Sequence, residues 1–174
     1  MAMLNPEKFI ENLRENKGVA MILAGSDSDK PHIQKIAKAL EEYSIPFCVR
    51  IYSAHKQPGE VVSVIHEFDL INCALAYIAV AGGTDALSGT ASFHSYNPVI
   101  SCPPDAPNDT CLRNPPGSSN AYIARADNVG KFIAQMYSHI NPDYRRLLEE
   151  KNKSKLKKLE EANVNFTLED TIKK

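Results

Sequence analysis

The sequence predicts an α/β fold in which a central parallel sheet carries helices on both faces. Residues 19–24 and 75–80 are short, continuously apolar runs, and their lack of polar alternation indicates strands that are covered on both sides. Apolar positions at the three- and four-residue spacing of a helix face recur between the strands, over residues 28–40 and 58–68. This alternation of strand and helix predicts right-handed crossovers within one sheet.

Five strands are expected in chain order, at residues 19–24, 47–52, 75–80, 98–102 and 121–124. Ser28 or Asp29 can cap the first crossover helix, and Asp127 is expected to cap a final helix. The inner face of that final helix would carry Val129, Phe132, Ile133 and Met136. Segment 103–119 holds five of the eleven prolines, and a connection of that length is usually functional or contains a short helix.

The length of 174 residues, with 43% hydrophobic and 24% charged side chains, suits one globular domain. We expect this domain over residues 19–140, preceded by a helical appendage at residues 1–18. Residues 141–174 are mostly charged with sparse apolar positions. This pattern predicts an extended helix that lies over the domain or over a neighbouring subunit.

The charge balance argues against a general nucleic-acid or membrane-surface binder. The formal net charge is −1, from 20 basic and 21 acidic side chains, so a small-molecule partner is expected. The four cysteines lie far apart, without the spacing of metal ligands, which favours a reduced cytoplasmic protein without a structural metal. No apolar run approaches the roughly 20 residues that span a bilayer, so neither a targeting nor an anchoring segment is expected.

Three polar loops follow predicted strands, and in a parallel sheet they would meet at one edge, where active sites form. The first loop, at residues 25–29, brings serine hydroxyls to a helix N-terminus, which attracts phosphate. The same residues are also common as simple helix caps. The loop lacks the glycine patterns of dinucleotide and nucleoside triphosphate sites, so neither ligand is predicted.

The second and third loops add a titratable group and flexible backbone. His55 can exchange protons near neutral pH and Lys56 can hold an anion, although a loop histidine is often only a solvated turn residue. In the third loop Gly82 and Gly83 allow close approach of the backbone to a ligand, or merely a tight turn, and Thr84 adds a hydroxyl. The convergence of three such loops favours a binding site.

These loops read Gly25-Ser26-Asp27-Ser28-Asp29, Ser53-Ala54-His55-Lys56 and Ala81-Gly82-Gly83. In order and spacing they closely resemble the catalytic subunit of phosphoribosylaminoimidazole carboxylase, over roughly residues 19–140. The resemblance implies a flavodoxin-like three-layer α/β/α sandwich with a C-terminal helical extension, assembled as a homo-octamer. It also implies a cytoplasmic enzyme of de novo purine biosynthesis that makes IMP precursors and needs no cofactor.

The family has two classes. One adds CO2 directly to 5-aminoimidazole ribonucleotide (AIR) and forms 4-carboxy-5-aminoimidazole ribonucleotide (CAIR), whereas the other is a mutase that converts N5-carboxyaminoimidazole ribonucleotide to CAIR. The mutase class usually has Arg at position 56 and His at position 86. This chain resembles the direct class at Lys56, Ala86-Leu87-Ser88-Gly89, Ile100-Ser101-Cys102-Pro103-Pro104 and Leu112-Arg113-Asn114-Pro115. It departs at Gly83, where direct carboxylases often have Arg.

The resemblance also implies residue roles. His55 would remove the proton from C4 of the ring and return it in the decarboxylation direction. Ser26 and Asp29 would contact the ribose phosphate, and Ser53 and Lys56 would hold phosphate or carboxylate. Gly82 and Thr84 would lie along the base and the CO2 pocket.

Other functions fit parts of the pattern. A flavodoxin-like electron carrier would use the same sheet edge, but the chain has no tryptophan to stack on a flavin ring. A phosphoacceptor domain would need a lone acceptor aspartate, which Asp27 and Asp29 resemble only superficially. A non-catalytic nucleotide-binding module would leave His55 without a purpose.

Overall fold

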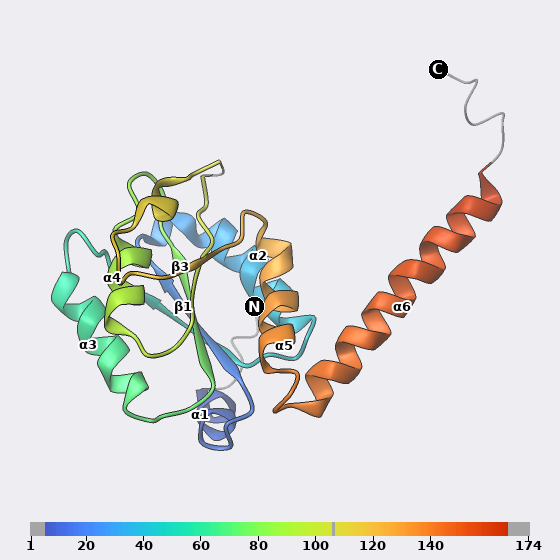
Figure 1. Cartoon of the computed structure of the whole chain (residues 1–174), viewed down its shortest axis with the longest axis horizontal. Coiled ribbons are helices and arrows are strands. Elements are labelled where there is room, and N and C mark those ends of the chain that lie inside the picture. Colours follow the sequence, from blue (N-terminus) through green and yellow to red (C-terminus); the bar gives the residue numbers. More distant parts are fainter. Residues whose placement is uncertain (1–5, 106, 167–174) are drawn as a thin grey trace.

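The computed structural model describes residues 6–105 and 107–166 and contains one five-stranded sheet. The strands are β1 (Val19–Ala24), β2 (Phe47–Ile51), β3 (Leu75–Val80), β4 (Val99–Ser101) and β5 (Ala121–Tyr122). Their order is β2-β1-β3-β4-β5, and every neighbouring pair is parallel (Figure 1). This order is that of flavodoxin-like folds. The predicted fold class is therefore confirmed.

Helices cover both faces of the sheet, because successive side chains of a strand point to opposite sides. Ala20, Ile22 and Ala24 of β1 pack with α2 (Lys30–Glu41) and α5 (Val129–Tyr137). The alternate residues Val19, Met21 and Leu23 pack on the other face, in one cluster with side chains of three helices. These helices are α1 (Pro6–Arg14), α3 (Pro58–Asp69) and α4 (Leu87–His94). Both faces of β1 are thus buried, as its unbroken apolar run predicts.

The final helix of the domain differs from its prediction. Asp127 does not cap α5, because it lies inside a 3-10 turn (Ala126–Asn128) and Asn128 occupies the cap position. Phe132 is 37% exposed rather than on the inner face. The cause is the close approach of α5 to α2, where a side chain at Gly130 would overlap the backbone carbonyl of Ala39. The face of α5 that contacts α2 therefore includes Gly130, and Phe132, two residues further along the helix, points away from that face.

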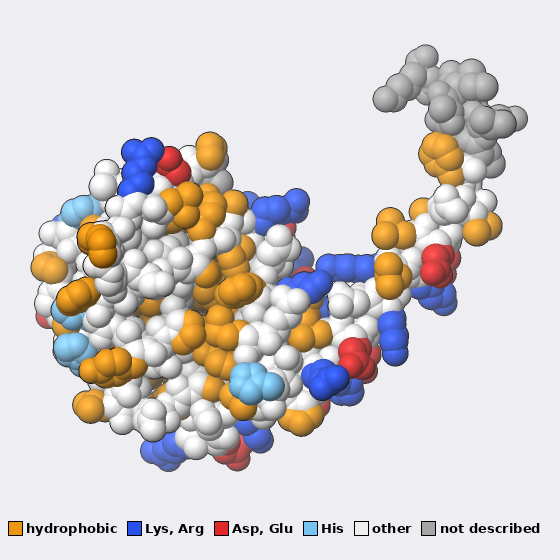
Figure 2. Space-filling view, viewed as in Figure 1, with side chains coloured by type: hydrophobic (Ala, Val, Ile, Leu, Met, Phe, Trp, Pro, Cys, Tyr) orange, Lys and Arg blue, Asp and Glu red, His pale blue; other side chains and the backbone are white. Residues whose placement is uncertain are grey.

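The two terminal helices behave differently. Phe9 and Leu13 of α1 are buried against the core, and the Phe9 ring meets Phe68 with centroids 6.1 Å apart. By contrast α6 (Pro142–Asn165) packs its first turns on α5 and then projects away from the body (Figure 1). Leu156 and Leu159 on the projecting part are 60% and 67% exposed, among the charged side chains that Figure 2 shows along this helix.

The first half of α6 thus lies against its own domain, where Leu147 and Leu148 pack on the core and Lys151 pairs with Glu42, and the second half extends beyond it. Residues 1–5 and 167–174, the outer parts of the two predicted terminal segments, lie outside the described residues. Of the helices in the described part of the chain, none is both long enough and apolar enough to cross a membrane. The segment at 103–119 contains a 3-10 turn (Thr110–Arg113), as its length suggests.

Candidate active site

The carboxyl edge of the sheet holds a pocket of about 140 Å3 where the three polar loops meet. Its wall is formed by Gly25, Ser26, Asp29, Ser53, Ala54, His55, Ala81, Gly82, Thr84, Ala86 and Leu87. The structure thus brings together all the predicted site residues except Lys56. Lys56 is exposed beside His55 in the sequence and does not line the pocket.

The first loop is held by its own hydrogen bonds. Ser26, rather than Ser28, caps the 3-10 turn that opens the helical segment: its Oγ accepts a hydrogen bond from the Ser28 N–H at 3.2 Å. The Gly25 N–H donates to the Val80 carbonyl at 2.9 Å and ties the loop to β3. Asp29 occupies the cap position of α2 but its carboxylate makes no capping bond. That carboxylate therefore remains available at the pocket wall.

The electrostatic setting of Asp29 is unusual for a loop carboxylate. Partial burial raises the pKa of Asp29, and the nearby carboxylates Asp105 and Asp27 raise it further, whereas His32 acts in the opposite direction. Burial likewise lowers the pKa of His32, whose Nε2 lies 3.1 Å from the Cys102 carbonyl oxygen. A hydrogen-bond donor or a cation bound beside Asp29 would therefore stabilise its carboxylate.

The second loop is a tight turn that presents His55. The Ser53 carbonyl accepts hydrogen bonds from the N–H groups of Lys56 and Gln57, at 3.1 and 2.7 Å. The Ser53 Oγ also accepts from the Lys56 N–H, at 3.3 Å. Tyr52 extends the pairing of β2, since its N–H donates to the Ala24 carbonyl. This anchoring places the exposed imidazole of His55 at the pocket.

A buried aspartate that the sequence analysis did not single out supports the third loop. Asp85 is 5% exposed, and its carboxylate accepts hydrogen bonds from the Ser88 N–H and the Ser101 hydroxyl, both at 2.9 Å. An aspartate just before a predicted helix commonly accepts a hydrogen bond from an N–H of the first turn, and this preference could have revealed the role of Asp85. Ala54, Ala81 and Leu87, which belong to the quoted motifs, form the apolar part of the wall.

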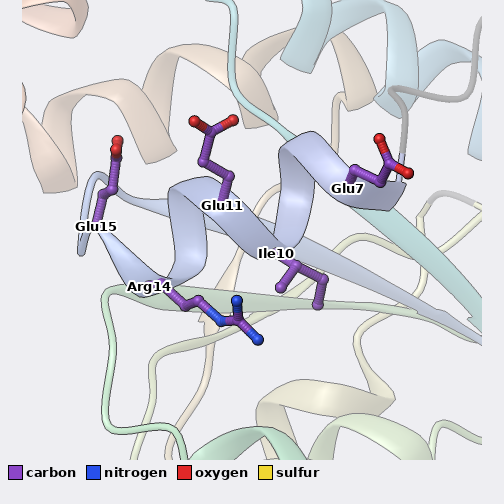
Figure 3. Close-up of a pocket in the computed structure, with 5 residues that line it drawn as sticks. All are labelled: Glu7, Ile10, Glu11, Arg14 and Glu15. Atoms are coloured by element: carbon purple, nitrogen blue, oxygen red, sulfur yellow. The ribbon is translucent and has the colours of Figure 1, made fainter.

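A larger hollow of about 610 Å3 borders α1 (Figure 3). Glu7, Glu11 and Glu15 lie along one side of the helix, and Ile10 and Arg14 point to another. Because α1 precedes β1, this hollow lies at the amino edge of the sheet, away from the loops described above. It contains none of the predicted site residues, so the small pocket at the carboxyl edge is the better candidate.

Residues 19–158 match the sequence model of the family described as AIR carboxylase. The chain belongs to the AIR carboxylase family. The match leaves out α1 and includes most of α6. The sheet, the three loops and the start of the projecting helix are therefore all family features.

Named members of the family show the same similarity. The phosphoribosylaminoimidazole carboxylase of Treponema denticola is 32% identical, over 89% of this chain and 96% of its own length. That of Archaeoglobus fulgidus is 30% identical over 75% of this chain and 76% of its own. The human bifunctional phosphoribosylaminoimidazole carboxylase/phosphoribosylaminoimidazole succinocarboxamide synthetase is 32% identical, but this chain covers only 31% of that protein. The crystal structure of Treponema denticola PurE superposes with a TM-score of 0.78 at 29% identity, covering 90% of this chain and 99% of that one.

Proposed function

We propose that this AIR carboxylase family member adds CO2 reversibly to C4 of AIR and forms CAIR in de novo purine biosynthesis. The observation that carries the proposal is that Ala86 lines the same pocket as His55. The mutase class that the sequence analysis describes has a second histidine at this position. A methyl group cannot transfer a proton, which leaves His55 as the one imidazole among the described residues of the pocket wall to accept the C4 proton.

The chemistry needs little from the protein beyond placement and one base. The electron-rich aminoimidazole ring attacks CO2 through C4, which forms the new carbon–carbon bond and leaves a tetrahedral C4 that still bears its proton. His55 accepts that proton, the C4–H bond breaks and the ring regains its aromaticity. In the reverse direction the same imidazole returns the proton and CO2 leaves.

The apolar part of the pocket suits CO2. Ala54, Ala81, Ala86 and Leu87 present carbon atoms, so a neutral gas molecule can enter at little desolvation cost. A volume of about 140 Å3 is below the roughly 300–1,000 Å3 typical of ligand sites. We therefore propose that the ring and CO2 occupy the pocket and that the ribose phosphate lies at its mouth.

The remaining predicted residues would bind the substrate at that mouth. Ser26 and Asp29 would contact the ribose phosphate portion, and Asp29 would accept a hydrogen bond from a ribose hydroxyl. Ser53 and Lys56 would hold the phosphate or the new carboxylate, with Lys56 reaching in from outside the wall. Gly82 and Thr84 would border the ring.

Mixing the purified protein with AIR and CO2-saturated buffer, without ATP, tests the proposal. Spectroscopic appearance of CAIR at a rate proportional to protein supports direct carboxylation. The alternative is the mutase, which Gly83 favours because its Gly-Gly pair resembles the mutase pattern. Product that forms only from N5-carboxyaminoimidazole ribonucleotide would establish that alternative. Binding of AIR without turnover of either substrate would indicate a non-catalytic module.

We also propose that the protein acts as a homo-octamer in the cytoplasm. Exposed Leu156 and Leu159 lie three residues apart on the projecting α6 and so share one helix face, which a neighbouring subunit could cover. The four cysteines are free, in keeping with a reducing compartment. Light scattering coupled to size-exclusion chromatography would measure the mass, and a monomer would contradict the octamer.

A further inference from the structure

The main chain of Gly83, in the third loop of the site, is held from both sides by one distant segment. The Gly83 N–H donates to Asp105 Oδ2 at 2.7 Å, and the Gly83 carbonyl accepts from Asn108 Nδ2 at 2.9 Å. The Thr110 hydroxyl donates to the same carbonyl at 3.2 Å. We propose that Asp105 and Asn108 are positioning residues, which fix the Gly82–Thr84 wall of the pocket for the reaction.

The residues that bond to Gly83, namely Asp105, Asn108 and Thr110, are also hydrogen-bonded to one another. Asn108 Nδ2 also donates to Asp105 Oδ1 at 2.9 Å, and the Thr110 hydroxyl lies 2.7 Å from Asn108 Oδ1. The Asp85 N–H donates to Thr110 Oγ1 at 3.0 Å, which links this network to the buried aspartate under the loop. Asn108 is buried, and its side-chain amide nitrogen donates to both the Gly83 carbonyl and the Asp105 carboxylate. The network therefore defines one position for the Gly83 peptide groups.

The contact reaches the pocket wall directly. A Cβ atom at Gly82, which lines the pocket, would lie 3.3 Å from the Asp105 carboxylate. Gly83 has a φ of +65°, a conformation that glycine adopts without strain. A loop of two glycines is intrinsically free to move, so its order must come from partners outside it. Hydrogen bonds from Asn108 and Gly83 lower the pKa of Asp105, which keeps it ionised as an acceptor at neutral pH.

This inference rests on the proposed function, in which Gly82 and Thr84 border the reacting ring. Misplacement of reacting groups by about 1 Å can cost about 100-fold in rate. Loss of the Asp105 acceptor should therefore slow the chemical step, whereas binding of the ribose phosphate at Ser26 and Ser53 should change little. Asp105 is exposed, so its removal should leave the core intact.

The test compares Asp105→Ala with Asp105→Asn, which keeps a carbonyl oxygen for the Gly83 N–H but loses the acceptor for Asn108 Nδ2. We expect Asp105→Ala and Asn108→Ala to lower kcat about 10- to 100-fold. We expect both variants to change the Kd for AIR by less than about threefold. This is well under the tenfold change in Kd that corresponds to about 1.4 kcal/mol of binding free energy. Asp105→Asn, which keeps one of the two acceptors, should have a kcat between those of Asp105→Ala and the wild type. Asp109→Ala is the matched control, because Asp109 lies in the same segment, is exposed and pairs with Arg113.

A second readout needs no turnover. Amide hydrogen exchange at Gly83 should accelerate in Asp105→Ala, accelerate less in Asp105→Asn, and stay near the wild-type rate in Asp109→Ala. Unchanged exchange and unchanged kcat in Asp105→Ala would overturn the proposal, as would equal damage by Asp105→Asn and Asp105→Ala. An inactive wild-type protein would instead refute the proposed function, and the exchange rates would then decide the positioning role by themselves.

Discussion

His55 and Ala86 line the same pocket although they follow different strands, β2 and β3. Ala86 places a methyl group where the mutase class has a second histidine, and Leu87 extends the apolar wall. One imidazole beside an apolar wall suits the addition of a neutral gas to an electron-rich ring. This relationship underlies the predictions for the site.

The first prediction concerns the base. Replacement His55→Asn should lower kcat by about 100- to 10,000-fold, because an amide cannot exchange a proton near neutral pH. Binding of AIR, measured by calorimetry, should stay within a few-fold of wild type. His139→Asn is the control, since His139 is an exposed histidine in the turn before α6. Equal losses of binding and turnover would instead make His55 a binding residue.

The second prediction concerns the exposed cation. Lys56→Ala should raise KM for AIR by about 10- to 100-fold, because a charged hydrogen bond contributes about 1.5–3 kcal/mol. The effect on kcat should be small, and Lys38→Ala, on the exposed side of α2, should change neither constant. Steady-state kinetics separates the two effects. An unchanged KM with a collapsed kcat would move Lys56 into the chemistry.

The third prediction concerns the space beside His55. Ala86→His introduces an imidazole into a pocket of about 140 Å3 and should displace CO2. We expect kcat/KM for CO2 to fall by at least about tenfold, the equivalent of 1.4 kcal/mol. Ala86→Gly keeps the space open and should retain most activity. A carboxylation rate in Ala86→His equal to that of wild type would show that CO2 binds elsewhere.

The fourth prediction concerns two buried tyrosines in the core beside α6. Burial raises the pKa of both phenols, so both are neutral in the folded protein. The Tyr144 hydroxyl donates to the Gly18 carbonyl at 2.5 Å, whereas the Tyr137 hydroxyl has no partner among the described residues. Tyr144→Phe should therefore lower the free energy of unfolding by about 1–3 kcal/mol, and Tyr137→Phe should raise it by about 1 kcal/mol.

Chemical denaturation of both tyrosine variants measures these changes. A loss of stability in Tyr137→Phe as large as in Tyr144→Phe would show that the Tyr137 hydroxyl has a partner. The two variants remove the same atom from the same core cluster, so each serves as the control for the other.

The strands and the loops could be read from the sequence because their signals are local. β1 and β3 have the predicted bounds, since each is a continuous apolar run that ends at a loop. β5 is shorter than predicted because its apolar signal is weak and it pairs only with β4. Phe132 could not be placed, since its exposure depends on the contact of Gly130 with α2.

Only part of the candidate site could be predicted from the sequence. The meeting of the three loops followed from the rule that parallel strands end at one edge. The hydrogen bond between Gly83 and Asp105 could not be predicted, because its donor is a main-chain N–H, which carries no sequence signal, and its acceptor is a carboxylate far away in the chain. The direction of α6 is also set by packing on α5 rather than by its own charged pattern.

The most direct measurement supplies AIR with carbon-13-labelled CO2 and an equal concentration of unlabelled N5-carboxyaminoimidazole ribonucleotide, without ATP. The 4-carboxylate of the CAIR formed at early times is then examined by carbon-13 NMR. Direct carboxylation predicts labelled CAIR, formed at a rate that rises with dissolved CO2 and that is lost in His55→Asn. Unlabelled CAIR would contradict direct carboxylation and would make the protein the mutase of its family.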